Sequence, residues 1–122
     1  MSVKQQADIA PQDLARRVAL LAEEKKASDI VVLDVSGLTT VTEAFVICSG
    51  GSEVQLAAII GSIVDGLEAE GITPSHRHRS AQSHWVVLDY GSVIVHVFTP
   101  PERAFYALEQ LWSAAKVLVR IQ

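Results

Sequence analysis

The stretch from Trp85 to Trp112, WVVLDYGSVIVHVFTPPERAFYALEQLW, predicts a β-hairpin that runs directly into a helix. Gly91 followed by Ser92 suits a two-residue type II′ turn, with glycine in the first central position, and this turn sets the pairing of the two strands. Directly opposed residues of a hairpin share one face of the sheet. One face is almost wholly apolar and is therefore predicted to lie in the core; its residues are Val86, Leu88, Tyr90, Val93, Val95 and Val97.

The opposite face of the hairpin carries a mixture of polar and aromatic residues, which are Trp85, Val87, Asp89, Ile94, His96 and Phe98. It is too polar for an ordinary core and too aromatic for an ordinary solvated surface, so we predict that it contacts a partner. The alternative is that a helix covers this face and that Asp89 and His96 form a diagonal pair across the strands. The sequence leaves both interpretations open.

The helix after the hairpin is predicted to begin with Thr99 as its cap. The residues that recur at helical spacing and are predicted to pack on the sheet are Phe105, Leu108 and Trp112. Arg103, Tyr106 and Gln110 lie on another face of the same helix. Because arginine and tyrosine are frequent in binding hot spots, this second face either extends the contact surface or is solvated, with Arg103 snorkelling.

Length, charge and cysteine content narrow the class of protein. A chain of 122 residues, of which 49% are hydrophobic, can bury one core, so we predict a single domain over 1–122 with its core at about 12–116. The formal charge of −4 disfavours binding dominated by nucleic-acid phosphates and favours a basic protein partner. Cys48 is the only cysteine, and no apolar run has the length of a membrane span or signal peptide core, so we expect a cytoplasmic protein.

Hydrophobic periodicity predicts an alternating order of helices and strands. The expected elements are a helix from Pro11, strands over 29–35 and 44–48, a helix over 53–70, the hairpin and the last helix. Ser52 and Gln55 form a capping box for the helix over 53–70, and Gly71 ends that helix. The polar stretch 76–84 shows no periodicity and is predicted to be a loop. This order indicates an α/β domain with a mixed β-sheet flanked by helices.

The turn from Ser49 to Ser52 leads into a helix N-terminus, where free backbone N–H groups can hold a phosphate. However, the turn lacks the lysine of a Walker motif and does not fit the dinucleotide fingerprint. A nucleotidyltransferase would in addition need closely spaced carboxylates to hold magnesium. Asp29 and Asp34 are five positions apart and therefore lie on opposite faces of one strand. We predict no active site and no cofactor.

A metal site has equally weak support. His76, His78 and His84 have donor atoms for zinc, but no cysteine joins them and the neighbouring arginines would repel a cation. A solvated basic loop from His76 to Arg79 fits these residues better. Cys48 continues an apolar run, which predicts a buried structural cysteine rather than a reactive thiol.

Four motifs carry a resemblance to a known family, in that family's order and spacing: DIVVLDV, TEAFVICSGGS, WVVLDYGSVIVHVF and ERAFYALEQLW. The chain resembles the Iojap family, the ribosomal silencing factors, from about Leu14 to Trp112. The resemblance implies a fold similar to that of nucleotidyltransferases without their catalytic carboxylates. It also implies binding to the large ribosomal subunit through its protein fourteen, where the small subunit would dock, and repression of translation when nutrients are short.

The resemblance also implies which residues bind the partner. The candidates at the family's signature positions are Trp85, Asp89, Tyr90, His96, Phe98, Arg103 and Tyr106, with a role in the core as the alternative for Tyr90. The chain departs from the family pattern at Glu43 and Ala44, where an aspartate and an aromatic residue or cysteine are common. It departs again at His78-Arg79, where Glu-Gly is common. This second departure replaces an acidic segment by a basic one and raises the question of a contact with ribosomal RNA.

We therefore predict a translation repressor without enzyme activity, whose hairpin and last helix dock on a large-subunit protein and exclude the small subunit by bulk. The first alternative is a nucleotide-binding or nucleotidyltransferase-like enzyme that uses the turn from Ser49 to Ser52. The second alternative is a homodimeric module that pairs through the aromatic face around Trp85.

Overall fold

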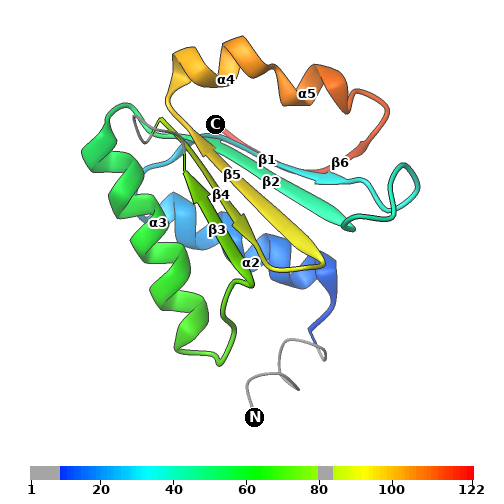
Figure 1. The fold of residues 1–122 in the computed structure, drawn as a ribbon, viewed down its shortest axis with the longest axis horizontal. Helices are drawn as coiled ribbons and strands as arrows, with labels where there is room; N and C mark the ends of the chain where they lie inside the picture. The colour runs from blue at the N-terminus through cyan, green and yellow to red at the C-terminus, as the bar shows by residue number, and fades with distance from the viewer. Residues whose placement is uncertain (1–8, 80–83) are drawn as a thin grey trace.

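The computed structural model describes residues 9–79 and 84–122, which form one open sheet with helices on both faces (Figure 1). The helices are α2 (Pro11–Glu24), α3 (Glu53–Glu68), α4 (Pro100–Tyr106) and α5 (Leu108–Leu111). The strands are β1 (Ser28–Asp34), β2 (Ala44–Ser49), β3 (His76–Arg79), β4 (Trp85–Asp89), β5 (Val93–Phe98) and β6 (Lys116–Ile121). The strand order is β3-β4-β5-β2-β1-β6. β2 and β5 pair in parallel and the other neighbours pair antiparallel, so the predicted α/β class with a mixed sheet is confirmed.

The larger core lies between the sheet and the helices α2 and α3. Val18 of α2, Ile63 of α3 and Leu88 of β4 are each fully buried in it. Gly66 allows the two helices to approach, because a Cβ at this position would lie 2.6 Å from Leu21 Cδ2. None of the described helices is long and apolar enough to cross a membrane.

A smaller core lies on the other face of the sheet, under α4 and α5 (Figure 1). Ile47 and Phe98 are fully buried there, and Phe45 is 7% exposed. Leu108 and Trp112 pack against these residues, and the rings of Trp112 and Phe45 meet edge to face with centroids 5.1 Å apart. Because both faces are covered, β2 is buried along its whole length and β1 is buried and apolar at its four positions from Ile30 to Leu33.

The first half of the chain folds as its periodicity predicts. α2, β1, β2 and α3 match the expected elements to within a few residues. The Ser52 hydroxyl accepts a hydrogen bond from the Gln55 N–H at 3.1 Å, which confirms this part of the predicted capping box. Gly71 has a φ of 81°, the left-handed conformation expected of a helix-ending glycine.

Two expectations about local structure, the loop at 76–79 and the continuous last helix, are wrong, and one strand was not expected. Residues 76–79 form the edge strand β3 instead of a loop, and residues 116–121 form β6, which was not predicted; 80–83 of the expected loop lie outside the described residues. The last helix is interrupted at Ala107, whose φ of 48° and ψ of 47° separate α4 from α5. Thr99 occupies the N-cap position of α4 but makes no capping hydrogen bond through its side chain.

Candidate functional site

The β4–β5 hairpin has the predicted register. Trp85 lies opposite Phe98 and Asp89 lies opposite Ile94, and the turn has glycine at Gly91 with a φ of 83°. The Asp89 carboxylate accepts a hydrogen bond of 2.7 Å from the Gly91 N–H and thereby holds the turn. The apolar face is confirmed as core, since each of its six predicted residues is at most 4% exposed. The burial of Tyr90 assigns its side chain to the core rather than to a surface.

The opposite face of the hairpin is only partly available to a partner. Phe98 is fully buried and His96 is 9% exposed, whereas Trp85 and Asp89 remain partly exposed. The expectation that this whole face is an open contact surface is therefore wrong at His96 and Phe98, while Ile94 of β5 is partly exposed. The smaller core includes Phe98, because β5 lies inside the sheet and α4 passes over it. The alternative interpretation, in which a helix covers the face, is correct for His96 and Phe98.

His96 is a neutral, buried residue that positions Trp85. The Trp85 indole Nε1–H donates a hydrogen bond of 3.2 Å to His96 Nδ1, and Phe45 meets the imidazole edge to face with ring centroids 5.3 Å apart. Burial lowers the pKa of His96 from 6.5 to about 4. The considered diagonal pair of His96 and Asp89 is not formed, because Asp89 hydrogen-bonds to the turn and His96 to Trp85.

Three aromatic side chains form a continuous row, which we call the aromatic ridge: the partly exposed Trp85 and the exposed Phe105 and Tyr106. The ring centroids of Trp85 and Tyr106 are 4.4 Å apart, and those of Tyr106 and Phe105 are 5.0 Å apart. Phe105 is 79% exposed and Tyr106 is 44% exposed, which is unusual for such large apolar groups. The prediction that Phe105 packs on the sheet is wrong, although Leu108 and Trp112 do pack there as predicted.

Arg103 is buried beneath the aromatic ridge. The sequence predicted either that its side chain contacts a partner or that it snorkels to solvent, and both predictions are wrong. Its Nε donates to Glu109 Oε1 at 2.8 Å and its Nη2 donates to Glu109 Oε2 at 2.9 Å. Its Nη1 donates to the Ser49 hydroxyl at 2.9 Å. The hydrogen bonds from Arg103 lower the pKa of Glu109. This network joins α4, α5 and β2 and thereby holds the ridge in place.

The turn from Ser49 to Ser52 uses its polar groups within the chain. Ser49 is 2% exposed and binds Arg103, while the Gly50 N–H donates to the Phe98 carbonyl at 2.9 Å. The Gly51 N–H donates to Gln55 Oε1 at 2.7 Å. These bonds occupy groups that a phosphate would need, so the arrangement gives the nucleotide-binding alternative no support.

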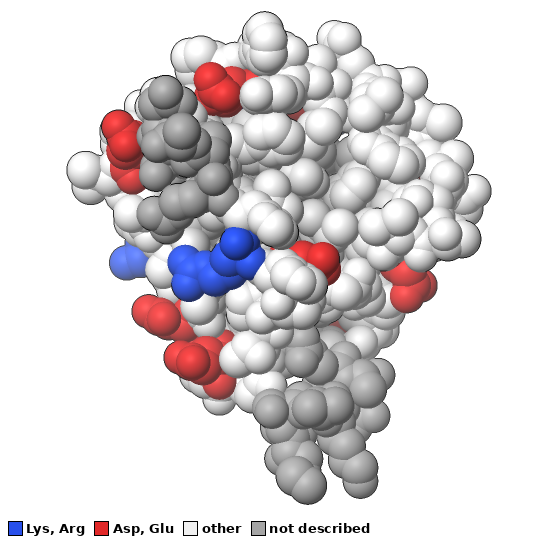
Figure 2. All heavy atoms as spheres, viewed as in Figure 1, with Lys and Arg blue, Asp and Glu red and all other residues white. Residues whose placement is uncertain are grey.

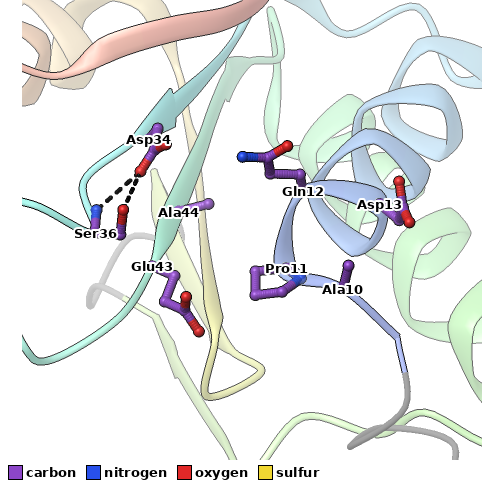
Figure 3. Close-up of a pocket in the computed structure, with 8 residues that line it drawn as sticks. All are labelled: Ala10, Pro11, Gln12, Asp13, Asp34, Ser36, Glu43 and Ala44. Carbon is purple, nitrogen blue, oxygen red and sulfur yellow. Dashed lines mark hydrogen bonds between the residues drawn. The ribbon is translucent and has the colours of Figure 1, made fainter.

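The carboxylates of β1 lie in different cavities. Asp34 lines a cavity of about 310 Å³ at the start of α2, shown in Figure 3, where its carboxylate accepts hydrogen bonds from the Ser36 N–H and hydroxyl. These bonds lower the pKa of Asp34. Asp29 lines a separate cavity of about 480 Å³ beside Arg103 and Glu109. The expectation that the two aspartates do not form a pair is confirmed.

The remaining candidate groups are buried or dispersed. Cys48 is fully buried and burial raises its pKa to about 12, which confirms a structural rather than a reactive thiol. The rings of His76 and His78 stack on β3, and His84 lies 3.9 Å from the Glu53 carboxylate. Within 9–79 and 84–122, no three residues of the histidine, cysteine, aspartate and glutamate types are grouped to hold a metal.

The fold and this site define a class of protein: a small α/β domain that presents an exposed aromatic ridge and, in its described part, has no paired carboxylates beside the glycine-rich turn. Residues 8–122 match the family described as ribosomal silencing factor during starvation, RsfS, and the chain belongs to this family. The resemblance to the Iojap family is confirmed.

Curated relatives and a solved structure agree with this assignment. The ribosomal silencing factor RsfS of Bacillus subtilis is 36% identical over 104 residues, which cover 85% of this chain and 88% of the relative. The chloroplastic protein Iojap of maize is 38% identical over 98 residues, which cover 80% of this chain and 42% of the relative. A crystal structure of a Chromobacterium violaceum protein has a TM-score of 0.82 at 30% identity, covering 86% of this chain and 88% of that one.

Proposed function

We propose that this chain represses translation by binding the large ribosomal subunit through its protein fourteen and excluding the small subunit by bulk. Membership in a family of ribosomal silencing factors supports a regulatory role on the ribosome rather than an enzyme activity. The observation that carries the choice of surface is the exposure of the aromatic ridge. Large aromatic groups in contact with one another and with solvent are typical of protein-binding hot spots.

The docking surface in this proposal is smaller than the set of signature residues. Trp85, Phe105 and Tyr106 make the direct contacts, with the partly exposed Asp89 at the rim. His96 and Arg103 act from beneath, because the first orients the Trp85 indole and the second holds α4 to β2. The net charge of −4 would speed association with a basic ribosomal protein.

The first experiment compares the wild type with Phe105→Asp in co-sedimentation with purified bacterial large subunits. Phe105 is 79% exposed, so the substitution places a charge on the ridge without disturbing the core. We expect the affinity to fall about 30-fold, the loss of one hot-spot residue, and the block of subunit joining to fall with it. The matched control is Val54→Asp on α3, where Val54 is 81% exposed; its affinity should stay within about twofold of the wild type.

The same preparation distinguishes the parts of the proposal. Titration of isolated ribosomal protein fourteen, followed by calorimetry, tests the partner, and addition of small subunits to the preloaded large subunits tests the block. A wild type that does not bind large subunits, or that binds them and still permits joining, would contradict the proposal. Equal losses in Phe105→Asp and Val54→Asp would show that the ridge is not the docking surface.

A further inference from the structure

The edge strand β3 is a basic surface on an otherwise acidic chain. Its described side chains, His76, Arg77 and His78, are all exposed, and the sequence adds a second arginine at Arg79. Figure 2 shows Lys and Arg side chains gathered over β3, with acidic side chains below the cluster and to its right. The formal charge of the whole chain is −4, so this cluster opposes the average charge of the molecule.

Among the described residues, Arg77 and Arg120 have no carboxylate within ion-pair distance, whereas three other arginines do. Arg17 pairs with Glu70 at 2.7 Å and the buried Arg103 pairs with Glu109 at 2.8 Å, while the exposed Arg16 lies 3.9 Å from Asp13. No ion pair involves Arg77 within the described part of the chain. Its guanidinium therefore keeps its full capacity to bind an external anion.

The two histidines of β3 extend the face that carries Trp85. His78 lies opposite Val87, which in turn lies opposite His96 on β5. The rings of His76 and His78 are nearly parallel, with centroids 6.0 Å apart and planes 13° apart. Arg77 points to the other face of the strand, because neighbouring residues of a strand alternate. The edge thus offers a cation on one face and flat rings on the other, beside the proposed docking surface.

We propose that β3 forms a second contact with the large subunit, in which Arg77 binds the phosphate backbone of ribosomal RNA and the stacked histidines pack against it. This inference rests on the proposed function, which brings the chain to a particle rich in RNA. Charge complementarity selects RNA over a protein partner, because an edge strand with an unpaired arginine on one face and flat rings on the other can contact phosphates and bases. The contact is auxiliary, in keeping with an acidic chain whose binding is not dominated by phosphates.

A basic edge strand has a second physical use, since charged residues at a sheet edge prevent pairing with another chain. This explanation requires nothing from RNA and makes a different prediction. If Arg77 only protects the edge, its loss should increase self-association of the free protein and leave the binding of large subunits unchanged.

The test measures the affinity of the full chain for large subunits between 50 and 200 mM salt, for the wild type and Arg77→Gln. Each phosphate contact contributes about 0.7 to 0.9 to the slope of log affinity against log salt, so the slope of Arg77→Gln should be shallower by about that amount. The matched control is Arg16→Gln on α2, which removes the same charge from an exposed side chain elsewhere. Its slope should equal that of the wild type.

Equal slopes for the wild type and Arg77→Gln, or equal changes in Arg77→Gln and Arg16→Gln, would overturn the inference. Increased self-association of Arg77→Gln with an unchanged slope would assign the strand to edge protection and would also overturn it. If the wild type does not bind intact large subunits, the proposed function fails. In that case, titration of protein-free large-subunit RNA decides the inference, which stands only if the affinity and its salt slope depend on Arg77.

Discussion

At the scale of single residues, His96 shows how a polar group in a signature position can serve a surface without being on it. Its imidazole is buried, contacts Phe45 and accepts a hydrogen bond from the Trp85 indole. A charged imidazolium would lose that acceptor and would be poorly solvated, so the folded state favours the neutral form. The orientation of Trp85 in the aromatic ridge therefore depends on the protonation state of His96 beneath it.

This burial predicts an acid-sensitive contribution to stability. The pKa of His96 is about 4 in the folded chain and 6.5 ordinarily, so between these values the unfolded state binds more protons. The free energy of unfolding therefore falls as pH falls below 6.5, and the loss levels off below about 4. Between pH 7 and pH 5 we expect His96 to account for a loss of about 2 kcal/mol.

Urea denaturation of the wild type and of His96→Gln at both pH values measures this effect. Glutamine offers an oxygen to the Trp85 indole and does not titrate, so the variant should lose about 2 kcal/mol less than the wild type over this range. Carboxylates titrate in both proteins and cancel in the difference. Parallel pH profiles of the two proteins would show that His96 does not become protonated in this way.

At the scale of elements, the break between α4 and α5 decides which aromatic residues face solvent. Ala107 adopts a left-handed conformation, which turns the chain so that Leu108 and Trp112 pack on the sheet while Phe105 is released. The same break brings Glu109 back to Arg103, although a continuous helix would not place residues six apart on one face. The ridge thus depends on one strained residue.

Glycine at this position should relieve the strain. A left-handed conformation costs an alanine about 1–2 kcal/mol, and glycine would remove this cost. Part of the resulting gain in stability is lost because glycine has greater conformational freedom in the unfolded chain. We expect Ala107→Gly to raise the free energy of unfolding by about 0.5–1 kcal/mol in urea denaturation. The control Ala104→Gly, inside α4, should lower it by a similar amount. A destabilised Ala107→Gly would mean that the break is not a source of strain.

Sequence patterns predict the features that depend on neighbouring residues and miss those that depend on residues far away in the sequence. The hairpin register and the start of α3 follow from local rules, since Gly91 suits the turn and Ser52 with Gln55 marks the cap. The break at Ala107 has no such signal, because alanine is a good helix former. The burial of Arg103 depends on Glu109 and on Ser49, which is far away in the sequence, so periodicity treats Arg103 as a surface residue.

At the scale of the whole molecule, both strands that periodicity missed lie at the edges of the sheet. An edge strand has one neighbour and more exposed side chains, so its sequence needs little apolar alternation. β3 reads HRHR, and β6 has a mixed pattern with Val119 and Ile121 packing against the larger core beyond the expected limit of 116. The two edges have opposite chemistry, because β3 is charged while β6 covers the apolar strand β1.

Removal of residues 116–122 should therefore affect both stability and association. The truncation removes the partly buried Leu118, Val119 and Ile121 and exposes the edge of β1, whose Ile30, Val31, Val32 and Leu33 are at most 3% exposed in the intact chain. At about 1–2 kcal/mol for each of these three side chains, we expect the free energy of unfolding to fall by about 3–6 kcal/mol. An uncovered apolar edge should also pair with a second copy, producing dimers and larger species in sedimentation velocity.

Val117→Ser provides the control, since Val117 is 46% exposed and its backbone keeps the pairing with β1. Its free energy of unfolding should change by less than about 1 kcal/mol and the protein should sediment as the wild type does. A truncated chain that stays in the wild-type association state with an unchanged urea midpoint would show that β6 is dispensable. A less stable, self-associating truncated chain would establish that β6 protects the edge of the sheet opposite to β3.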